Sequence, residues 1–280
     1  MFFDEWNVLL VDDEPDVLSV TKLALKDVKV YGLPIKLHTA GSKAEAIDVL
    51  KRPSSIRMGI ESALAVAFID VVMESQTAGL ELCEYIRGPL KNKTAQLYIR
   101  TGQPGVAPER SVIDRYDISG YLTKVETTEQ KLYSLVKTGI RQWFTFWYAD
   151  NIAQITNAEI QNSATKEQLL KFIDVGDPEF EPTGITAGIV FENKHFITDR
   201  TQAQVQQLHD ELDQLPPFKT WPEGHKLVIA GDSLMVKVVA TEHTVDYYYV
   251  IHGHMPLPEA LYDITFDNGL ALSMLYKRAK

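Results

Sequence analysis

Five apolar segments alternate with helical patterns over the first 140 residues of this 280-residue chain, and this alternation limits the possible folds more than any other feature. The apolar segments are typical of strands and lie at residues 7–11, 35–39, 63–73, 96–100 and 120–124. Between them, apolar residues recur at steps of three and four, as at Val17, Val20 and Leu23, which is typical of helices. Because right-handed crossovers return such a chain to the same sheet, we predict an α/β domain with a five-stranded parallel sheet.

Polar and charged residues stand at the carboxyl ends of four of the expected strands. Asp12 and Asp13 follow the first strand, Asp70 comes late in the third segment, Thr101 follows the fourth strand, and Lys124 ends the fifth. In an open parallel sheet, ligands bind beyond these strand ends. We therefore expect the five side chains to converge on one site.

Three carboxylates gathered in one place repel one another unless a cation neutralises them. Mg²⁺ favours oxygen ligands and keeps part of its water shell. We therefore predict a magnesium site made by Asp12, Asp13 and Asp70, together with the backbone carbonyl of Val72.

Asp70 is the expected nucleophile of this site. A carboxylate can attack a phosphoryl donor and form an acyl phosphate, and positioning and charge neutralisation supply most of the catalysis of such a transfer. Mg²⁺ and the Lys124 ammonium would neutralise charge, while the Thr101 hydroxyl would donate a hydrogen bond to a new phosphoryl oxygen. Inward movement of Thr101 would vacate space for an aromatic side chain such as Tyr121, and this would change the surface of the domain.

These residues occur in the segments LLVDDE, AFIDVVM, RTGQPG and GYLTKVE, and in this order and spacing they resemble the receiver domain of bacterial response regulators. The resemblance spans residues 5–140. It implies a flavodoxin-like, CheY-like fold, phosphorylation of Asp70 to 4-aspartylphosphate, and Thr101 and Tyr121 as switch residues. It also implies a two-component phosphorelay with a histidine kinase or a histidine phosphotransfer protein as the phosphoryl donor. The downstream protein is unknown, and signalling would use protein–protein contacts or dimerisation.

The length of the chain suggests a second domain. We expect a receiver at residues 1–140, a helical linker at 141–162 and a small α+β domain at 163–280, with strands at 187–191, 226–230, 234–240 and 247–252 and a last helix at 258–276. The helix that starts near residue 127 carries Trp143, Phe144 and Trp147, more apolar surface than one sheet needs. It could form the seam of a homodimer or pack against the second domain, and both interpretations stay open.

The second domain resembles the GAF-like domain that follows the receiver in some HD-GYP response regulators. The chain ends at Lys280 without the metal-binding catalytic part of an HD-GYP domain, so we expect no catalytic output domain and no enzyme beyond self-phosphorylation and autodephosphorylation. An alternative function is a small-molecule sensor whose ligand modulates phosphosignalling. His252 and His254, with His225 and His243, could ligate a metal, but surface or hydrogen-bonded histidines are the other interpretation.

Charge and composition exclude further classes of function. A net charge of −10 opposes nucleic-acid binding, since that needs clustered lysine and arginine. The start MFFDEWN lacks the features of a signal peptide, and no apolar run is long enough to span a bilayer. Cys83 is the only cysteine and reads as a buried structural thiol. We therefore expect a cytoplasmic protein without membrane insertion.

Overall fold

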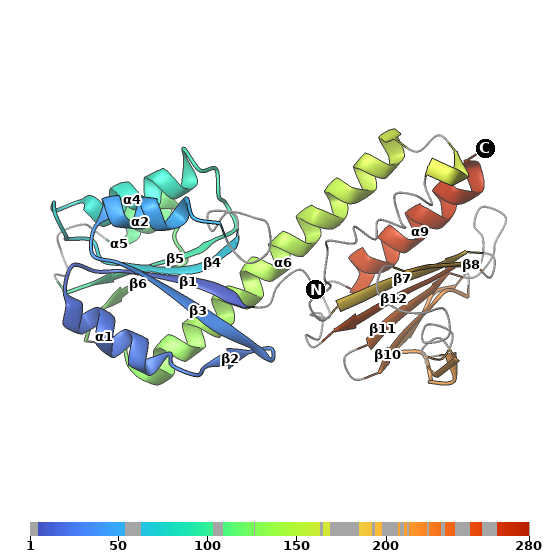
Figure 1. Cartoon of the computed structure of the whole chain (residues 1–280), viewed down its shortest axis with the longest axis horizontal. Coiled ribbons are helices and arrows are strands. Elements are labelled where there is room, and N and C mark those ends of the chain that lie inside the picture. Colours follow the sequence, from blue (N-terminus) through green and yellow to red (C-terminus); the bar gives the residue numbers. More distant parts are fainter. Residues whose placement is uncertain are drawn as a thin grey trace. The chain divides into compact units, whose positions relative to one another are not determined.

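A computed structural model describes the chain in two compact units, Phe3–Trp147 and a second one that contains Tyr148–Lys280. The described residues are 5–53, 63–102, 109–125, 127–162, 165–168, 185–191, 194–197, 207, 210–211, 213–222, 224–230, 233–238, 247–253 and 262–279. Figure 1 shows the elements of both units.

The first unit is built on a six-stranded sheet with the order β2-β3-β1-β4-β5-β6. Its strands are β1 (Trp6–Val11), β2 (Lys29–Val30), β3 (Leu33–Ala40), β4 (Leu64–Ile69), β5 (Gln96–Thr101) and β6 (Gly120–Thr123). All pairings among β1, β3, β4, β5 and β6 are parallel, which confirms the predicted parallel sheet of five strands. The sheet also has an unexpected edge strand, because β2 pairs antiparallel with β3.

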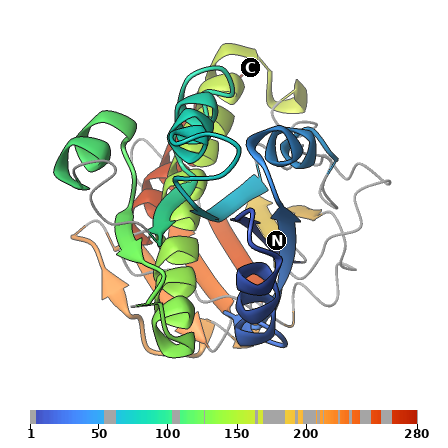
Figure 2. The same ribbon diagram turned by 90° about the vertical axis from the view of Figure 1, so that its left-hand side faces the viewer.

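Helices cover both faces of this sheet. They are α1 (Pro15–Ala24), α2 (Lys43–Leu50), α4 (Ala78–Arg87), α5 (Glu109–Tyr116) and α6 (Glu129–Asn162). In Figures 1 and 2, α2 and α4 lie on one face, while α1 and the first half of α6 lie on the other. This two-sided cover explains why every residue of β1, β4 and β5 is buried, as expected for central parallel strands.

An aromatic cluster joins α6 to the amino end of β1. The rings of Trp6 and Trp143 meet edge to face at 6.2 Å, and Trp147 stacks on both Trp143 and Phe144. The indole N–H of Trp6 donates a hydrogen bond of 2.8 Å to the carbonyl of Val30. Part of the apolar surface that the sequence shows on this helix is therefore buried within the first unit, in the cluster with Trp6.

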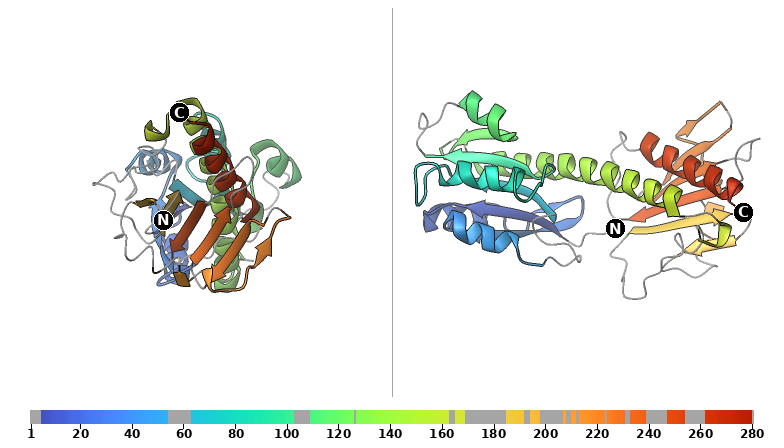
Figure 3. Two further views of the ribbon diagram at one scale, coloured as in Figure 1. Left: turned by 90° about the vertical axis from the view of Figure 1, so that its right-hand side faces the viewer. Right: turned by 90° about the horizontal axis from the view of Figure 1, so that it is seen from above.

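The second unit contains an antiparallel sheet with the order β8-β7-β12-β11-β10-β9. Its strands are β7 (Ile185–Phe191), β8 (Lys194–Ile197), β9 (Lys219–Thr220), β10 (Lys226–Ala230), β11 (Ser233–Val238) and β12 (Tyr247–Gly253). Helix α9 (Tyr262–Arg278) packs along this sheet, in contact with β11 and β12 (Figure 3). The four strands and the last helix expected here are all present, whereas the likeness to a GAF domain stays a prediction.

A metal site at the histidines of the second unit stays a prediction. His243 and His254 lie outside the described residues. His225 is buried, with its ring 5.5 Å from that of Phe266. Among the described residues, the group that comes together as a possible metal site consists of Asp12, Glu14 and Asp70, and it lies in the first unit.

Within the same described part of the chain, no helix combines the length and the apolar character needed to cross a membrane.

Candidate functional site

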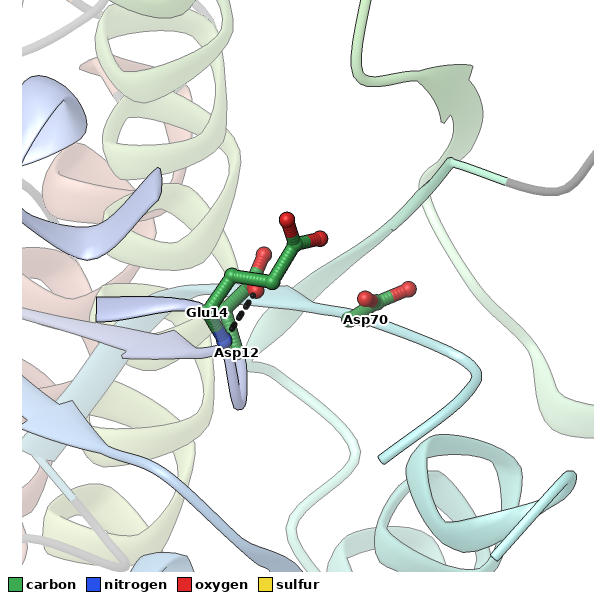
Figure 4. A group of neighbouring side chains, drawn as sticks. All are labelled: Asp12, Glu14 and Asp70. Carbon is green, nitrogen blue, oxygen red and sulfur yellow. Dashed lines mark hydrogen bonds between the residues drawn. The ribbon is translucent and has the colours of Figure 1, made fainter. Parts of the chain in front are cut away.

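Three carboxylates come together where β1 and β4 end (Figure 4). Asp12 follows β1, Glu14 precedes the first residue of α1, and Asp70 follows β4. One carboxylate oxygen of each residue lies within 4.8 Å of one from each of the others. Because β1 and β4 are neighbours in the sheet, the backbone holds the group together, and the amide of Asp70 donates to the carbonyl of Val11 at 2.9 Å.

The ammonium of Lys124 contacts all three carboxylates. Its Nζ lies 2.7 Å from Asp70 Oδ2, 3.0 Å from Asp12 Oδ2 and 2.6 Å from Glu14 Oε1. Lys124 directly follows β6, and its amide donates to the carbonyl of Thr101 at 2.9 Å. Lys124 at the end of β6 therefore lies beside Asp12 at the end of β1 and Asp70 at the end of β4. The sequence predicts this convergence of the three residues.

Burial and charge act in opposite directions on these groups. Burial raises the pKa of Asp70, and the nearby Asp12 charge raises it further, while the hydrogen bond and charge of Lys124 oppose this. Burial by itself would lower the pKa of Lys124, but hydrogen bonds to Asp70, Glu14 and Asp12 outweigh it, so the pKa lies well above its ordinary value. The hydrogen bond to Lys124 lowers the pKa of Glu14. Lys124 therefore stays charged and is the main partner of Asp70.

Four further residues were expected at this site, and the structure places each of them differently. Asp13 is exposed and is not part of the carboxylate group, where Glu14 stands instead. Thr101 is the last residue of β5 and is buried, and Tyr121 in β6 is half-buried and packs against the core. Val72 lies two residues after Asp70, with its side chain against the same core.

Sequence reasoning missed a second cation at this site. Arg100, in β5, is buried, and its Nη2 lies 3.4 Å from Asp12 Oδ2. Its Nη1 donates to Thr21 Oγ1 at 2.8 Å. An arginine in a strand that is buried on both faces indicates a partner of opposite charge nearby, because buried charges occur only when they are paired.

Helix α4 approaches the backbone of Asp70 very closely. The amide of Gly79 donates to the carbonyl of Val71 at 3.1 Å. A methyl group on Gly79 would lie 1.8 Å from the carbonyl oxygen of Asp70, far inside any real contact distance. The first turn of α4 therefore fits against the end of β4 only with glycine at position 79.

The donor set is suited to a hard divalent cation. Carboxylate oxygens are the preferred protein ligands of Mg²⁺, and two of the three carboxylates present here, Asp12 and Asp70, are buried. These two residues were also predicted as magnesium ligands.

No family model matches the chain. Over 140 residues, it is 41% identical to the "3'3'-cGAMP-specific phosphodiesterase 2" of Vibrio cholerae serotype O1 (strain ATCC 39315 / El Tor Inaba N16961). The match covers 50% of this chain and 25% of the relative, so the chain spans about a quarter of the length of that protein.

Solved structures that resemble the first half of the chain include response regulator receiver domains. A receiver domain protein from Clostridium thermocellum has 19% identity and a TM-score of 0.40, over 50% of this chain and 98% of that one. The signal receiver domain of an HD domain-containing protein from Pseudomonas fluorescens Pf-5 has 19% identity and a TM-score of 0.41, over 50% and 97%. An adenylate cyclase from Rhodopirellula baltica has 18% identity and a TM-score of 0.43, over 54% and 98%.

The relative from Vibrio cholerae corrects one expectation. We expected no enzyme and no catalytic output, because the chain shows no metal-binding catalytic motif of an HD-GYP domain. This expectation is contradicted, because the protein that shares 41% identity with half of the chain is named a 3'3'-cGAMP-specific phosphodiesterase. The absence of a motif from a sequence is no evidence that an activity is absent.

Proposed function

We propose that this chain is the regulatory part of a two-component response regulator and accepts a phosphoryl group on Asp70. The observation that carries the proposal is the 2.7 Å contact between Lys124 Nζ and Asp70 Oδ2, beside two more carboxylates at the carboxyl edge of a parallel sheet. A histidine kinase or a histidine phosphotransfer protein would donate the phosphoryl group.

In the transfer, an Asp70 carboxylate oxygen forms a bond to phosphorus while the bond from phosphorus to the donor breaks. The donor leaves with the electron pair of that bond. Lys124 neutralises charge on the phosphoryl oxygens, and the Thr101 hydroxyl donates a hydrogen bond to one of them. Tyr121 then changes its packing and passes the change to the surface.

Asp12, Asp13 and Asp70, with the Val72 carbonyl, are the proposed ligands of Mg²⁺. When bound, Mg²⁺ supplies further neutralisation of the phosphoryl charge. The structure brings Glu14 to the carboxylate group and leaves Asp13 outside it. Glu14 is therefore a further candidate for this role.

We also propose that phosphorylation of Asp70 controls hydrolysis of a cyclic dinucleotide. The support is the 41% identity to a 3′3′-cGAMP-specific phosphodiesterase over half of this chain. Phosphorylation would thus regulate an enzymatic output rather than DNA binding, which the net charge of −10 opposes.

Intact-mass spectrometry after incubation with acetyl phosphate and Mg²⁺ tests the phosphoacceptor. We expect the wild-type protein to gain the mass of one phosphoryl group and Asp70→Asn to gain none. Asp48→Asn, which changes an exposed aspartate of α2, is the matched control and should be modified like the wild type. If Asp70→Asn were modified as readily as the wild type, the assignment of Asp70 would be wrong.

A further inference from the structure

Arg100 is held between the sheet and α1 by two contacts. Its Nη1 donates to Thr21 Oγ1 at 2.8 Å, and its Nη2 lies 3.4 Å from Asp12 Oδ2. The Thr21 hydroxyl donates its own proton to the carbonyl of Val17 at 2.7 Å, so its lone pairs are free to accept from the guanidinium. The orientation of Arg100 is therefore set by helix α1 as well as by Asp12.

The two cations share the oxygens of Asp12. Oδ1 accepts from the amide of Glu14 at 3.0 Å and from Lys124 at 3.1 Å. Oδ2 lies 3.0 Å from Lys124 and 3.4 Å from Arg100. Since Asp12 is only 1% exposed, water cannot replace either cation. Among the described residues, Lys124 would be the one cation left in contact with this buried carboxylate if Arg100 were absent.

A buried carboxylate that loses its last cation is strongly destabilised. A chain without Arg100 would therefore keep Lys124 on Asp12. Lys124 would then be less available to a phosphoryl group on Asp70, and it would compete with a metal ion for the Asp12 oxygens. The contact of Arg100 with Asp12 removes this conflict.

We propose that Arg100 is a positioning residue that holds the Asp12 carboxylate from the side of α1 and so frees Lys124 and Asp12 for phosphoryl transfer and Mg²⁺ binding. This inference rests on the proposed phosphoacceptor function. Arg100 acts through Asp12 and Lys124 and makes no contact with the reacting atoms itself.

The test uses the full chain and measures Mg²⁺ affinity by calorimetry and the rate of phosphorylation by acetyl phosphate at saturating Mg²⁺. Arg100→Met should weaken Mg²⁺ binding about tenfold or more, as is common when a group that orients a metal ligand is removed. Its phosphorylation rate should also fall. Arg100→Lys, which keeps a charge near Asp12, should recover most of the Mg²⁺ affinity.

Arg87→Met is the matched control. Arg87 is also largely buried, but its guanidinium donates to the carbonyls of Asn92, Ala95 and Asp117, away from the carboxylate group. Arg87→Met should lower the melting temperature while its Mg²⁺ affinity stays within about twofold of the wild type. Thr21→Val provides a milder variant, because it removes the hydroxyl that orients Arg100 and keeps the charge; it should weaken Mg²⁺ binding less than Arg100→Met.

Two results would overturn the inference alone. If Arg100→Met binds Mg²⁺ as well as the wild type, Arg100 is a purely structural residue. If it binds more tightly, Arg100 acts against the metal by repulsion. In both cases the proposal that the wild-type protein is phosphorylated on Asp70 would be unaffected. A wild-type protein that neither binds Mg²⁺ nor is phosphorylated would instead overturn the proposed function together with the inference.

Discussion

The single ammonium group of Lys124 contacts three carboxylates, and two of them are buried. Such a group is stable only while positive charge is present. Arg100 supports Asp12 but lies on the side of α1, so Asp70 depends mainly on Lys124. The balance of charge at this site should therefore respond both to substitution of Lys124 and to added Mg²⁺.

Lys124→Met should lower the free energy of unfolding by about 3 kcal/mol or more in EDTA, because it leaves buried carboxylates without their shared cation. Millimolar Mg²⁺ should restore part of this loss and stabilise the variant more than it stabilises the wild type. Urea unfolding with and without Mg²⁺ measures both effects. An equal gain from Mg²⁺ in the two proteins would contradict the idea that metal and lysine neutralise the same carboxylates.

His38 gives a prediction for pH dependence. It is half-buried in β3, its Nε2 lies 2.8 Å from Asn7 Oδ1, and burial, aided by the Lys36 charge, lowers its pKa below 6.5. Folding therefore favours neutral His38. The stability that this residue contributes is complete above pH 6.5 and is lost as the pH falls through the lowered pKa of the folded state.

His38→Gln should remove this part of the pH dependence. We expect the melting temperature of the wild type to fall more than that of His38→Gln between pH 7.5 and pH 5. Thermal unfolding followed by circular dichroism at both pH values measures the difference. A parallel fall in the two proteins would show that His38 does not sense pH.

At the scale of single elements, the fit of α4 against the end of β4 depends on one glycine. Gly79→Ala would place a methyl group 1.8 Å from the carbonyl oxygen of Asp70, so α4 or the strand end must move. We expect a loss of about 3 kcal/mol or more in the free energy of unfolding, at the upper end for overpacking, and slower phosphorylation of Asp70.

Gly41→Ala is the control for this prediction. Among the described residues, its new methyl group would meet only the end of the Glu45 side chain, at 3.5 Å, an ordinary contact distance. Urea unfolding should leave its stability within about 0.5 kcal/mol of the wild type. If both variants were equally stable, the close fit of α4 to Asp70 would not be needed.

Local patterns predicted the parallel strands well, but edge strand β2 was missed. β2 and β3 are joined by Tyr31 and Gly32, which both have positive φ, 51° and 80°. Two such residues are typical of a tight hairpin turn. The usual sequence signal for this turn is Asn-Gly or Asp-Gly, and a tyrosine at its first position gives no such signal, so the two-residue strand before it could not be recognised.

The candidate site was predicted from strand ends, and this approach found Asp12, Asp70 and Lys124 because parallel strands bring their carboxyl ends to one edge. It could not find Arg100, whose contacts span 79 residues to Thr21 and 88 to Asp12. It also missed Glu14, which meets Lys124 from 110 residues away. Sequence separation is not the reason, because Asp12 and Lys124 were found although they are 112 residues apart. Arg100 lies within β5 and Glu14 lies beyond the end of β1, so attention to strand ends alone overlooked both, although an arginine in a buried strand was a usable signal.

For the molecule as a whole, the proposed control of hydrolysis by phosphorylation can be tested directly. If phosphorylation of Asp70 controls hydrolysis of a cyclic dinucleotide as proposed, the rate at which the protein hydrolyses 3′3′-cGAMP, the compound in the name of the Vibrio cholerae relative, should change with acetyl phosphate and Mg²⁺. Asp70→Asn should remove this response. Chromatographic assay of the linear product measures the rate. Hydrolysis that is indifferent to acetyl phosphate in both proteins would contradict control through Asp70.

The aromatic cluster between β1 and α6 has a practical consequence for optical work on this protein. Three of its four tryptophans, Trp6, Trp143 and Trp147, lie in that cluster, while Trp221 stacks on Phe266 in the second unit. Trp6 begins β1 and Asp12 follows it, so roughly 20 Å of strand separates Trp6 from Asp12. The intrinsic tryptophan fluorescence therefore reports mainly on the packing of α6 against the sheet. A change in emission upon phosphorylation would show that a structural change at Asp70 reaches the opposite end of the domain.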